Sequence, residues 1–280
     1  MFYLLNYFIQ MKILLNNSDL NEALSNITNL GFVPTMGSLH KGHISLIKKS
    51  LKECKKTIVS IFVNPTQFNN KNDYKNYPRN NKKDFSILKK LKVNFLYLPK
   101  ENDVYYFKRK SLIQLKKKDK ILCAKFRKGH FEGVIDVMDR LNKIVKPEKI
   151  YMGEKDFQQI YLVKKYIKFK DNTKIISCKT IRDKDNLAFS SRNKLLNKSE
   201  LKKVKLISRE MFLLKKRLFK SKNIKKILLE KKDKLTSLFN IKFDYLELRD
   251  TANFKCSNRV KNSKLFFAYY INKVRLIDNF

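Results

Sequence analysis

The chain has 280 residues, of which 43% are hydrophobic and only 6 are Gly and 5 Pro, a composition that argues against long disordered or fibrous segments. Its length suggests one large or two modest domains. The 64 Lys and Arg against 25 Asp and Glu give a formal net charge of +39, which ordinarily suggests a nucleic acid or an anionic membrane as partner. The lysines are spread along nearly the whole chain, however, and only 11 of the 64 are Arg, so we favour a solvated basic surface over selected polyanion binding.

The cysteines and the N-terminus indicate where the protein works. The four cysteines are far apart and form no C-x-x-C pair, and no signal peptide precedes them, which predicts a reduced, cytoplasmic protein without a zinc site of its own. Residues 1–10, MFYLLNYFIQ, are apolar but too short to span a bilayer, so we expect no membrane association. We interpret these ten residues as an extension or a misplaced start, because Met11 begins a plausible alternative start.

Apolar runs alternate with amphipathic stretches through the first 180 residues. Ser18 is expected to cap a first helix, and Gly31 follows that helix before a strand at 32–34. Further strands are expected at 57–63, 93–98, 149–152 and 174–178. Helices are expected at 40–54, 84–91, 132–145 and 158–169. Continuous apolar runs such as TIVSIFV are typical of strands buried on both faces, so residues 1–180 are predicted to form an α/β, Rossmann-like, doubly wound parallel sheet.

The pattern changes after Ile181. Lys-rich amphipathic helices are expected at 199–219 and 222–239, and the strand-like runs DYLELRD, FFAYYI and VRLID follow in close succession. Helices followed by a cluster of strands are typical of a separate α+β unit. We therefore predict a smaller C-terminal α+β domain spanning residues 181–280.

The segment FVPTMGSLHKGH, residues 32–43, reads as a buried strand, a turn of small residues and the start of a helix. Unpaired backbone N–H groups and the positive end of the helix dipole make such a helix start an anion site, where His40 and His43 could meet a phosphate. The alternative is a structural or metal-binding pair of histidines on one helix face. The segment alone leaves both interpretations open.

The segment FVNPTQF, residues 62–68, ends the next predicted strand. Ligands of parallel sheets bind outside the carboxyl ends of the strands, so Asn64 and Gln67 are expected to face the same crevice as the two histidines. Their amides would bind hydroxyls and carboxylates without adding charge. Taken alone, the Asn-Pro pair is better explained as the start of a turn.

The segment GEKDFQQ, residues 153–159, again follows a short strand and opens a helix. Glu154 and Asp156 suit the positive end of the helix dipole. Lys155 does not, because a cation at a helix N-terminus is unfavourable unless an anion lies beside it. A phosphate would supply that anion, with Asp156 near a metal or a ribose.

The segment IRDKDNLAFSSRN, residues 181–193, lies at the predicted domain junction. Ser190, Ser191 and Arg192 offer hydroxyl, backbone and guanidinium donors that suit a triphosphate. A linker with a serine helix cap explains the same residues equally well when the segment is considered alone.

The four segments together point to a family. HKGH resembles the H-x-G-H element of the nucleotidyl-transferase superfamily. The chain more closely resembles the pantothenate synthetase (pantoate–beta-alanine ligase) family, through the ordered motifs PTMGSLHKGH, VSIFVNPTQF, YPR, GHFEGV, GEKDFQQ, LAFSSRN, DYLELRD and VRLIDN. This resemblance covers essentially the whole chain from Met11 to Asn279.

The resemblance implies an enzyme that condenses pantoate with beta-alanine, using ATP and a pantoyl-adenylate intermediate, to give pantothenate, AMP and pyrophosphate. It also implies that Mg²⁺ accompanies ATP and that the protein is a homodimer through its first domain. Two alternatives would contradict it: a basic nucleic-acid-binding protein on the same scaffold, and a related cytidylyl- or adenylyltransferase with another acceptor. Scarce Arg and the lack of an aromatic platform in a basic groove argue against specific nucleic-acid binding.

The resemblance also assigns site residues. His40 and His43 would be catalytic, with His43 as the proton donor. The substrates pantoate and beta-alanine would be bound by Gln67, Gln159 and Asn64. The ATP site would comprise Met36, Gly37, Ser38, Leu39, His40, Lys41, Gly42, His43, Gly153, Glu154, Lys155, Asp156, Ile181, Phe189, Ser190, Ser191 and Arg192. Asp84 is the remaining metal candidate, because lysines precede it where the family often has a second acid.

The sequence departs from the family pattern at several positions. Lys128 stands where members usually have Pro, Asn186 where they have Gly, and Phe189 where they have Met. Asn tolerates a left-handed backbone, so Asn186 is a mild change. The larger Phe189 is expected to tighten or crowd the nucleotide pocket. Residues 101–126 match least well, which predicts altered stability of an active-site lid.

Overall fold

The computed structural model describes residues 11–106, 113–169, 173–221 and 223–280. The predicted N-terminal extension, residues 1–10, lies outside these ranges. So do residues 107–112 of the divergent region and Lys222, the expected first residue of a helix. No helix in the described ranges combines the length and apolar character that crossing a membrane requires.

Among the described residues, six parallel strands form one sheet in the order β1-β4-β3-β2-β5-β6. The strands are β1 (Lys12–Leu14), β2 (Leu30–Thr35), β3 (Lys56–Ile61), β4 (Phe95–Tyr97), β5 (Lys149–Gly153) and β6 (Lys174–Cys178). The predicted doubly wound parallel sheet is thereby confirmed. The edge strand β1 was not predicted.

Successive residues of the central strands point to opposite faces of this sheet, as the pleat requires. Phe32 packs in one apolar core, and its neighbour Val33 packs in a second core on the other face. The core of Phe32 is covered by α1 (Asn17–Leu24), α7 (His130–Val145) and α8 (Phe157–Tyr166). The core of Val33 is covered by α2 (Lys41–Glu53) and α4 (Asn81–Lys90). Burial on both faces explains the continuous apolar runs.

Two local predictions at the first helix were wrong. The cap of α1 is Asn16, whose side-chain oxygen accepts a hydrogen bond from the Asp19 N–H at 2.9 Å, so Ser18 lies inside the helix. Gly31 is a residue of β2 and does not follow the helix end directly. A Cβ at Gly31 would lie 2.1 Å from Ser50 Oγ, so this glycine permits close packing of β2 against α2.

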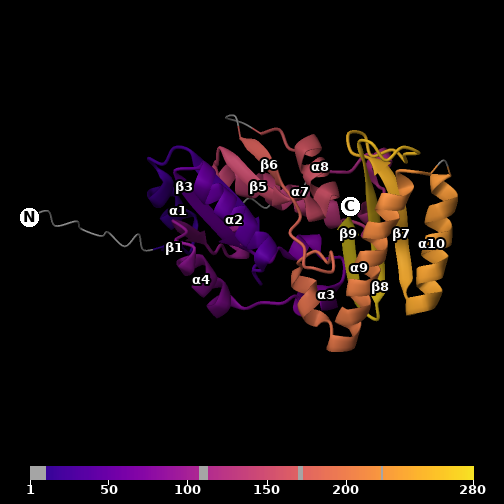
Figure 1. Ribbon diagram of the computed structural model, residues 1–280. Helices are drawn as coiled ribbons and strands as arrows, with labels where there is room; N and C mark the ends of the chain where they lie inside the picture. The colour runs from indigo at the N-terminus through magenta and orange to yellow at the C-terminus, as the bar shows by residue number, and fades with distance from the viewer. Residues whose placement is uncertain (1–10, 107–112, 170–172, 222) are drawn as a thin grey trace, which may run out of the picture.

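The C-terminal part contains, within its described residues, an antiparallel sheet in the order β7-β8-β9. Its elements are α9 (Lys198–Leu218), α10 (Ile224–Phe239), β7 (Lys242–Asp250), β8 (Ser263–Ile271) and β9 (Val274–Asn279). The helices α9 and α10 pack on one face of this sheet (Figure 1). Tyr245 and Phe266 on the other face join the core of Phe32, so the two sheets share buried apolar surface.

Short helices connect these elements. They are α3 (Lys71–Lys75), α5 (Glu101–Val104), α6 (Cys123–Phe126), η1 (Pro65–Gln67), η2 (Lys117–Asp119), η3 (Glu154–Asp156) and η4 (Ser191–Leu195). Three of them, η1, η3 and η4, contain residues from the segments that the sequence marked as chemically significant.

The topology of the parallel sheet locates a ligand crevice. Strand β2 pairs with β3 on one side and with β5 on the other, so the connections diverge between β2 and β5. Ligands of open α/β sheets bind outside the carboxyl ends of strands at such a switch point. Here β2 ends at Thr35 and β5 ends at Gly153.

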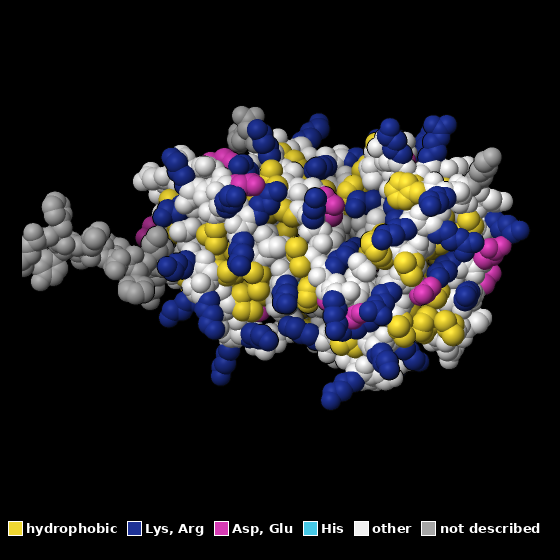
Figure 2. Space-filling model, viewed as in Figure 1, with side chains coloured by type: hydrophobic (Ala, Val, Ile, Leu, Met, Phe, Trp, Pro, Cys, Tyr) yellow, Lys and Arg dark blue, Asp and Glu magenta, His cyan; other side chains and the backbone are white. Residues whose placement is uncertain are grey.

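The basic side chains do not gather in one place on the face that Figure 2 displays. Lys and Arg are scattered over both parts of the molecule there, interspersed with apolar and uncharged residues. This distribution agrees with the interpretation of the excess lysines as a solvated basic surface.

Candidate active site

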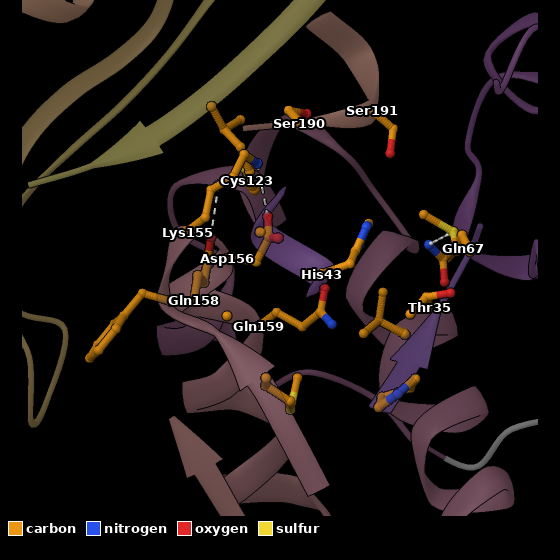
Figure 3. A pocket seen from close by; sticks show the side chains of 18 of the residues that line it. Thr35, His43, Gln67, Cys123, Lys155, Asp156, Gln158, Gln159, Ser190 and Ser191 are labelled. Carbon is orange, nitrogen blue, oxygen red and sulfur yellow. Dashed lines mark hydrogen bonds and ion pairs between the residues drawn. The ribbon is translucent and has the colours of Figure 1, made fainter. Parts of the chain in front are cut away.

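A cavity of about 260 Å³ opens at the switch point and is bounded by residues of both sheets. Most of the predicted site residues line it. They are Met36, His40, Gly42, His43, Asn64, Gln67, Gly153, Lys155, Asp156, Gln159, Ile181, Phe189, Ser190, Ser191 and Arg192. Figure 3 shows Lys155 and Asp156 on one side of His43, Gln67 on the other, and Ser190 and Ser191 entering from a different part of the chain.

The remaining predicted residues do not line the cavity. These are Gly37, Ser38, Leu39, Lys41, Glu154 and Asp84. Asp84 is 1% exposed, and its two oxygens accept hydrogen bonds from the N–H groups of Ser38 at 2.7 Å and Leu39 at 2.8 Å. This carboxylate fixes the turn ahead of the histidines and does not line the cavity, and its role in metal binding stays a prediction.

The two histidines occupy the start of α2. His40 is the N-cap residue, and its Nδ1 accepts a hydrogen bond from the Gly42 N–H at 3.2 Å. Its Nε2 must therefore hold the proton of the neutral ring. The rings of His40 and His43 stack with centroids 4.0 Å apart. Among the described residues, the buried Nδ1 of His43 has no hydrogen-bond partner, which leaves it available for a ligand.

Burial and nearby cations keep both histidines uncharged. Burial, the largest cause, together with Lys155 and Lys194 lowers the pKa of His40 to about 4, against an opposing effect of Asp156. Burial likewise holds the pKa of His43 well below 6.5, with additional contributions from His40, Lys155 and Lys194. A charged imidazole is disfavoured in both places because desolvation and like charge act in the same direction. A bound anion would reverse the electrostatic part of this effect.

The cations around the histidines come from two loops. Lys155, whose side chain is 19% exposed, lies 3.4 Å from Asp156 Oδ1 through its Nζ. Lys194 in η4 donates through its Nζ to Ser38 Oγ at 2.7 Å. Ser191, the first residue of η4, contacts the same turn, because its Oγ donates to the Ser38 carbonyl at 3.2 Å. The serine-rich loop of the C-terminal part therefore contacts the turn that carries the histidines.

The loop that leads to these serines contains the predicted left-handed residue. Asn186 has φ +62°, so the Asn that replaces the usual Gly adopts the conformation that made it a mild change. Phe189 lines the cavity, and the Lys41 Nζ lies 5.5 Å from its ring centroid. A cation over an aromatic face is an attractive contact.

Amide side chains also line the cavity. Asn64 is 1% exposed, and its Nδ2 donates to Gln67 Oε1 and to the Gly133 carbonyl, each at 3.3 Å. Gln67 Nε2 contacts Met36 Sδ at 2.9 Å. Gln159 lies at the first turn of α8 and faces the same cavity (Figure 3). These uncharged donors and acceptors suit a ligand with hydroxyl and carboxylate groups.

Sequence reasoning missed a buried group behind Gln67. His130 Nδ1 lies 2.7 Å from the Gln67 carbonyl and so donates to it, which leaves Nε2 to accept from Arg127 Nη1 at 2.8 Å. Arg192 and Arg127 both approach Asp73 Oδ2, at 2.9 and 4.0 Å. The motifs VNPTQF and GHFEGV were visible in the sequence, but no spacing rule indicates that Gln67 and His130 meet.

The fold and the site together indicate a class of enzyme. A Rossmann-like parallel sheet with an H-x-G-H helix start at its switch point, flanked by a lysine and a serine–arginine loop, is the arrangement of a nucleotide-binding enzyme. Residues 12–280 match the family model for pantoate-beta-alanine ligase. The pantothenate synthetase of Francisella tularensis subsp. novicida is 42% identical over 276 residues, which covers 94% of this chain and 93% of the relative.

Other relatives give the same result. The pantothenate synthetase of Francisella philomiragia is 41% identical over 273 residues, covering 93% of this chain and 92% of the relative. The Francisella tularensis pantoate-beta-alanine ligase, solved in complex with beta-gamma ATP and beta-alanine, is similar with a TM-score of 0.83 at 40% identity, over 96% of this chain and 97% of that one. The pantothenate synthetase of Thermus thermophilus gives a TM-score of 0.89 at 29% identity, over 96% of this chain and 99% of that one. The chain therefore belongs to the pantoate-beta-alanine ligase family and is an enzyme of that type.

Proposed function

We propose that this protein activates pantoate with ATP to form pantoyl adenylate and then transfers the pantoyl group to beta-alanine, which gives pantothenate. The observation that carries this proposal is a single cavity that combines the stacked histidines, Lys155 and the Ser190–Arg192 loop with the uncharged amides of Gln67 and Gln159. The histidines, Lys155 and the serine–arginine loop suit a polyphosphate, and the two glutamines suit a small hydroxy acid.

In the first step, an oxygen of the pantoate carboxylate attacks the α-phosphorus of ATP. The bond from that phosphorus to the oxygen that bridges to the β-phosphate breaks, and pyrophosphate leaves. Phosphoryl-centre chemistry asks the protein mainly for alignment and fixed positive charge. Lys155 and Arg192 supply that charge, and the start of α2 adds backbone N–H groups.

The histidines act as donors in the same step. The neutral ring of His40 carries its proton on Nε2 and donates a hydrogen bond to a phosphate oxygen through it. His43 donates a hydrogen bond from whichever ring nitrogen faces the ligand. Binding of the polyanion raises the pKa of both rings, because a nearby negative charge favours the protonated form. His43 is thereby prepared to give a proton to the departing pyrophosphate.

In the second step, the amine of beta-alanine attacks the acyl carbon of pantoyl adenylate and AMP leaves. Gln67 and Gln159 orient the pantoate hydroxyl and carboxylate groups through both steps, and Gln67 also lies beside the beta-alanine site. Ile181 contacts the adenine of the nucleotide, and Phe189 closes over the triphosphate together with the Ser190–Arg192 loop. Uncharged amides at these positions avoid the cost of burying further charge.

Mg²⁺ enters the reaction with ATP. The described residues contain no cluster of three side chains that could hold a metal ion. Mg²⁺ is commonly bound by substrate phosphates with one or two carboxylates, and Asp156 in the cavity lining would supply such a ligand. We further propose that the enzyme is a cytoplasmic homodimer. The homodimer rests on the family resemblance, and the four cysteines, all described and unpaired, accord with a reducing compartment.

The decisive experiment measures pyrophosphate release with ATP and pantoate, in the presence and absence of beta-alanine. We expect release that depends on pantoate, that stops near one equivalent per site without beta-alanine, and that continues with it while AMP and pantothenate accumulate. Release that is independent of pantoate, or formation of ADP and phosphate, would contradict the proposal. Turnover with a nucleotide acceptor in place of pantoate would indicate the transferase alternative.

A further inference from the structure

The motif VRLIDN forms the whole of strand β9, and none of the proposed roles involves it. Its final residue, Asn279, closes β9, pairs across the sheet with Phe266 and is 2% exposed. Its amide nitrogen Nδ2 donates to two consecutive carbonyls, of Glu154 at 2.8 Å and of Lys155 at 2.9 Å. Both hydrogens of one amide are thus committed to the loop that carries Lys155.

These two bonds define the backbone at Lys155. The carbonyls belong to η3, a three-residue helix that has no side-chain cap hydrogen bond. Holding the carbonyls on both sides of Lys155 Cα fixes the two peptide planes that meet there, and with them the direction of its Cα–Cβ bond. The side chain of Lys155 then extends into the cavity, near Asp156 and the histidines (Figure 3).

Asn279 is itself held firmly. Its N–H donates to Asp278 Oδ1 at 2.7 Å, and its carbonyl accepts from Arg182 Nη2 at 2.7 Å. Arg182 also donates to both carboxylate oxygens of Asp278, at 2.6 and 3.0 Å, and to the Asn186 carbonyl at 2.8 Å. A bidentate arginine–carboxylate pair restrains orientation as well as distance. The end of β9 is therefore a rigid support between two loops of the nucleotide site.

The other atom of the amide supports a specific role. Among the described residues, the buried Oδ1 of Asn279 has no hydrogen-bond partner. Rotating the amide would place this oxygen against the two carbonyls, so the observed orientation is the one that the surroundings permit. A buried acceptor without a partner is costly, and a small apolar residue would remove that cost while keeping the strand. The paired donation to Glu154 and Lys155 is what distinguishes Asn from such a residue.

We propose that Asn279 is a positioning residue that places the Lys155 ammonium for contact with the phosphates of ATP. The proposal rests on the proposed role of Lys155 in ATP binding. It assigns the C-terminal end of the chain a function in a site formed mainly by the first sheet. Asn279 lines the same cavity, and the role proposed here acts through the loop that carries Lys155.

The test is a double-mutant cycle between Asn279→Ala and Lys155→Met, read as the dissociation constant for a non-hydrolysable ATP analogue and, where turnover is measurable, as kcat/KM for ATP. We expect Asn279→Ala to weaken nucleotide binding and kcat/KM by about 10- to 100-fold, the scale of effect that a misplaced catalytic group produces. In the Lys155→Met background the same change should cost less than about twofold, because the side chain to be positioned is gone. The KM for beta-alanine should stay within about twofold of wild type, since Asn279 acts at the phosphate end.

Leu276→Ala is the matched control for a purely structural role, because Leu276 lies on the same strand and is 6% exposed in the core under α9 and α10. It should lower thermal stability at least as much as Asn279→Ala, with equal effects on nucleotide binding in the wild-type and Lys155→Met backgrounds. Asn279→Ser keeps one donor and should give an intermediate loss, so it serves if the alanine variant folds poorly.

Effects of Asn279→Ala that are equal in both backgrounds, or wild-type nucleotide affinity in the Ala and Ser variants, would overturn the proposal. Failure of the proposed function would look different. If Lys155→Met binds the analogue as tightly as wild type, then the role of Lys155 is wrong, whatever Asn279 does. If pyrophosphate release is absent in the wild type while the analogue still binds, the binding cycle continues to test Asn279.

Discussion

The rings of His40 and His43 stack in a place that already contains Lys155 and Lys194, and burial together with these cations lowers the pKa of both rings. In the free protein at neutral pH, the site therefore holds fixed positive charge only on lysine and arginine. In the proposed mechanism, the phosphates of ATP raise the pKa of both rings, and His43 gives a proton to the departing pyrophosphate.

His43→Ala tests this assignment. We expect pantoate-dependent pyrophosphate release to fall by roughly 10²- to 10³-fold, because a positioned donor at a phosphoryl centre typically contributes an effect of that size. The fold should be retained, since the buried Nδ1 of His43 has no partner to lose in the described protein. Turnover is measured by coupled detection of pyrophosphate, and thermal unfolding serves as the control for folding. Turnover similar to wild type in a folded variant would remove His43 from the mechanism.

At the scale of elements, the position of Gln67 in the cavity wall depends on how closely η1 approaches α7. A Cβ built on Gly133 would lie 2.4 Å from the Thr66 carbonyl oxygen and 2.9 Å from the Gln67 backbone nitrogen. The neighbouring atoms are backbone, which cannot rotate aside. Glycine at this helix position therefore allows η1 to seat Gln67 against the cavity, and the adjacent bond from His130 to the Gln67 carbonyl maintains that position.

Gly133→Ala is expected to weaken pantoate use although alanine is the better helix former. Helix propensity favours the change by about 1 kcal/mol, but a clash with backbone must displace η1 and Gln67 with it. We expect the KM for pantoate to rise by about tenfold or more and thermal stability to fall, as measured by steady-state kinetics and calorimetry. Glu132→Ala, the preceding residue, is the control and should change neither quantity appreciably. A stabilised Gly133→Ala enzyme with normal pantoate kinetics would contradict the packing argument.

At the scale of the whole molecule, the pKa values of all three histidines are lowered. Burial is the largest cause at each, and it holds the pKa of His130 well below 6.5 with a further contribution from Arg127. Unfolding returns each ring to its ordinary pKa near 6.5, so below that pH the unfolded chain binds more protons than the folded protein. Stability should therefore decrease as the pH falls from 6.5 toward the lowered values in the folded state.

The expected loss is about 1 kcal/mol per histidine between pH 7.5 and pH 5.5, a window in which ordinary carboxylates stay ionised. Urea unfolding at a series of pH values measures it. A saturating ATP analogue should reduce the loss, because the bound phosphates raise the pKa of His40 and His43 in the folded protein. A free energy of unfolding that is constant across this window would contradict the burial-driven shifts.

The sequence by itself determined the sheet and the position of the site along the chain. Runs such as TIVSIFV can be buried only between two layers, and the motifs at 36–43, 62–68 and 153–159 follow strands whose carboxyl ends must share one edge. Residue identities in those motifs, in their order, were sufficient to identify the family resemblance that the comparisons confirmed.

Only the tertiary structure decided which distant residues support that site. The bond from Ser38 to Asp84 beneath the turn, the bond from His130 to Gln67 and the bond from Asn279 to the Lys155 loop each depend on packing geometry. Periodicity and propensity act over a few neighbouring residues, whereas these contacts join positions about 45 to 125 residues apart in the sequence. Such contacts form because two buried surfaces meet, and a one-dimensional pattern carries no record of which surfaces those are.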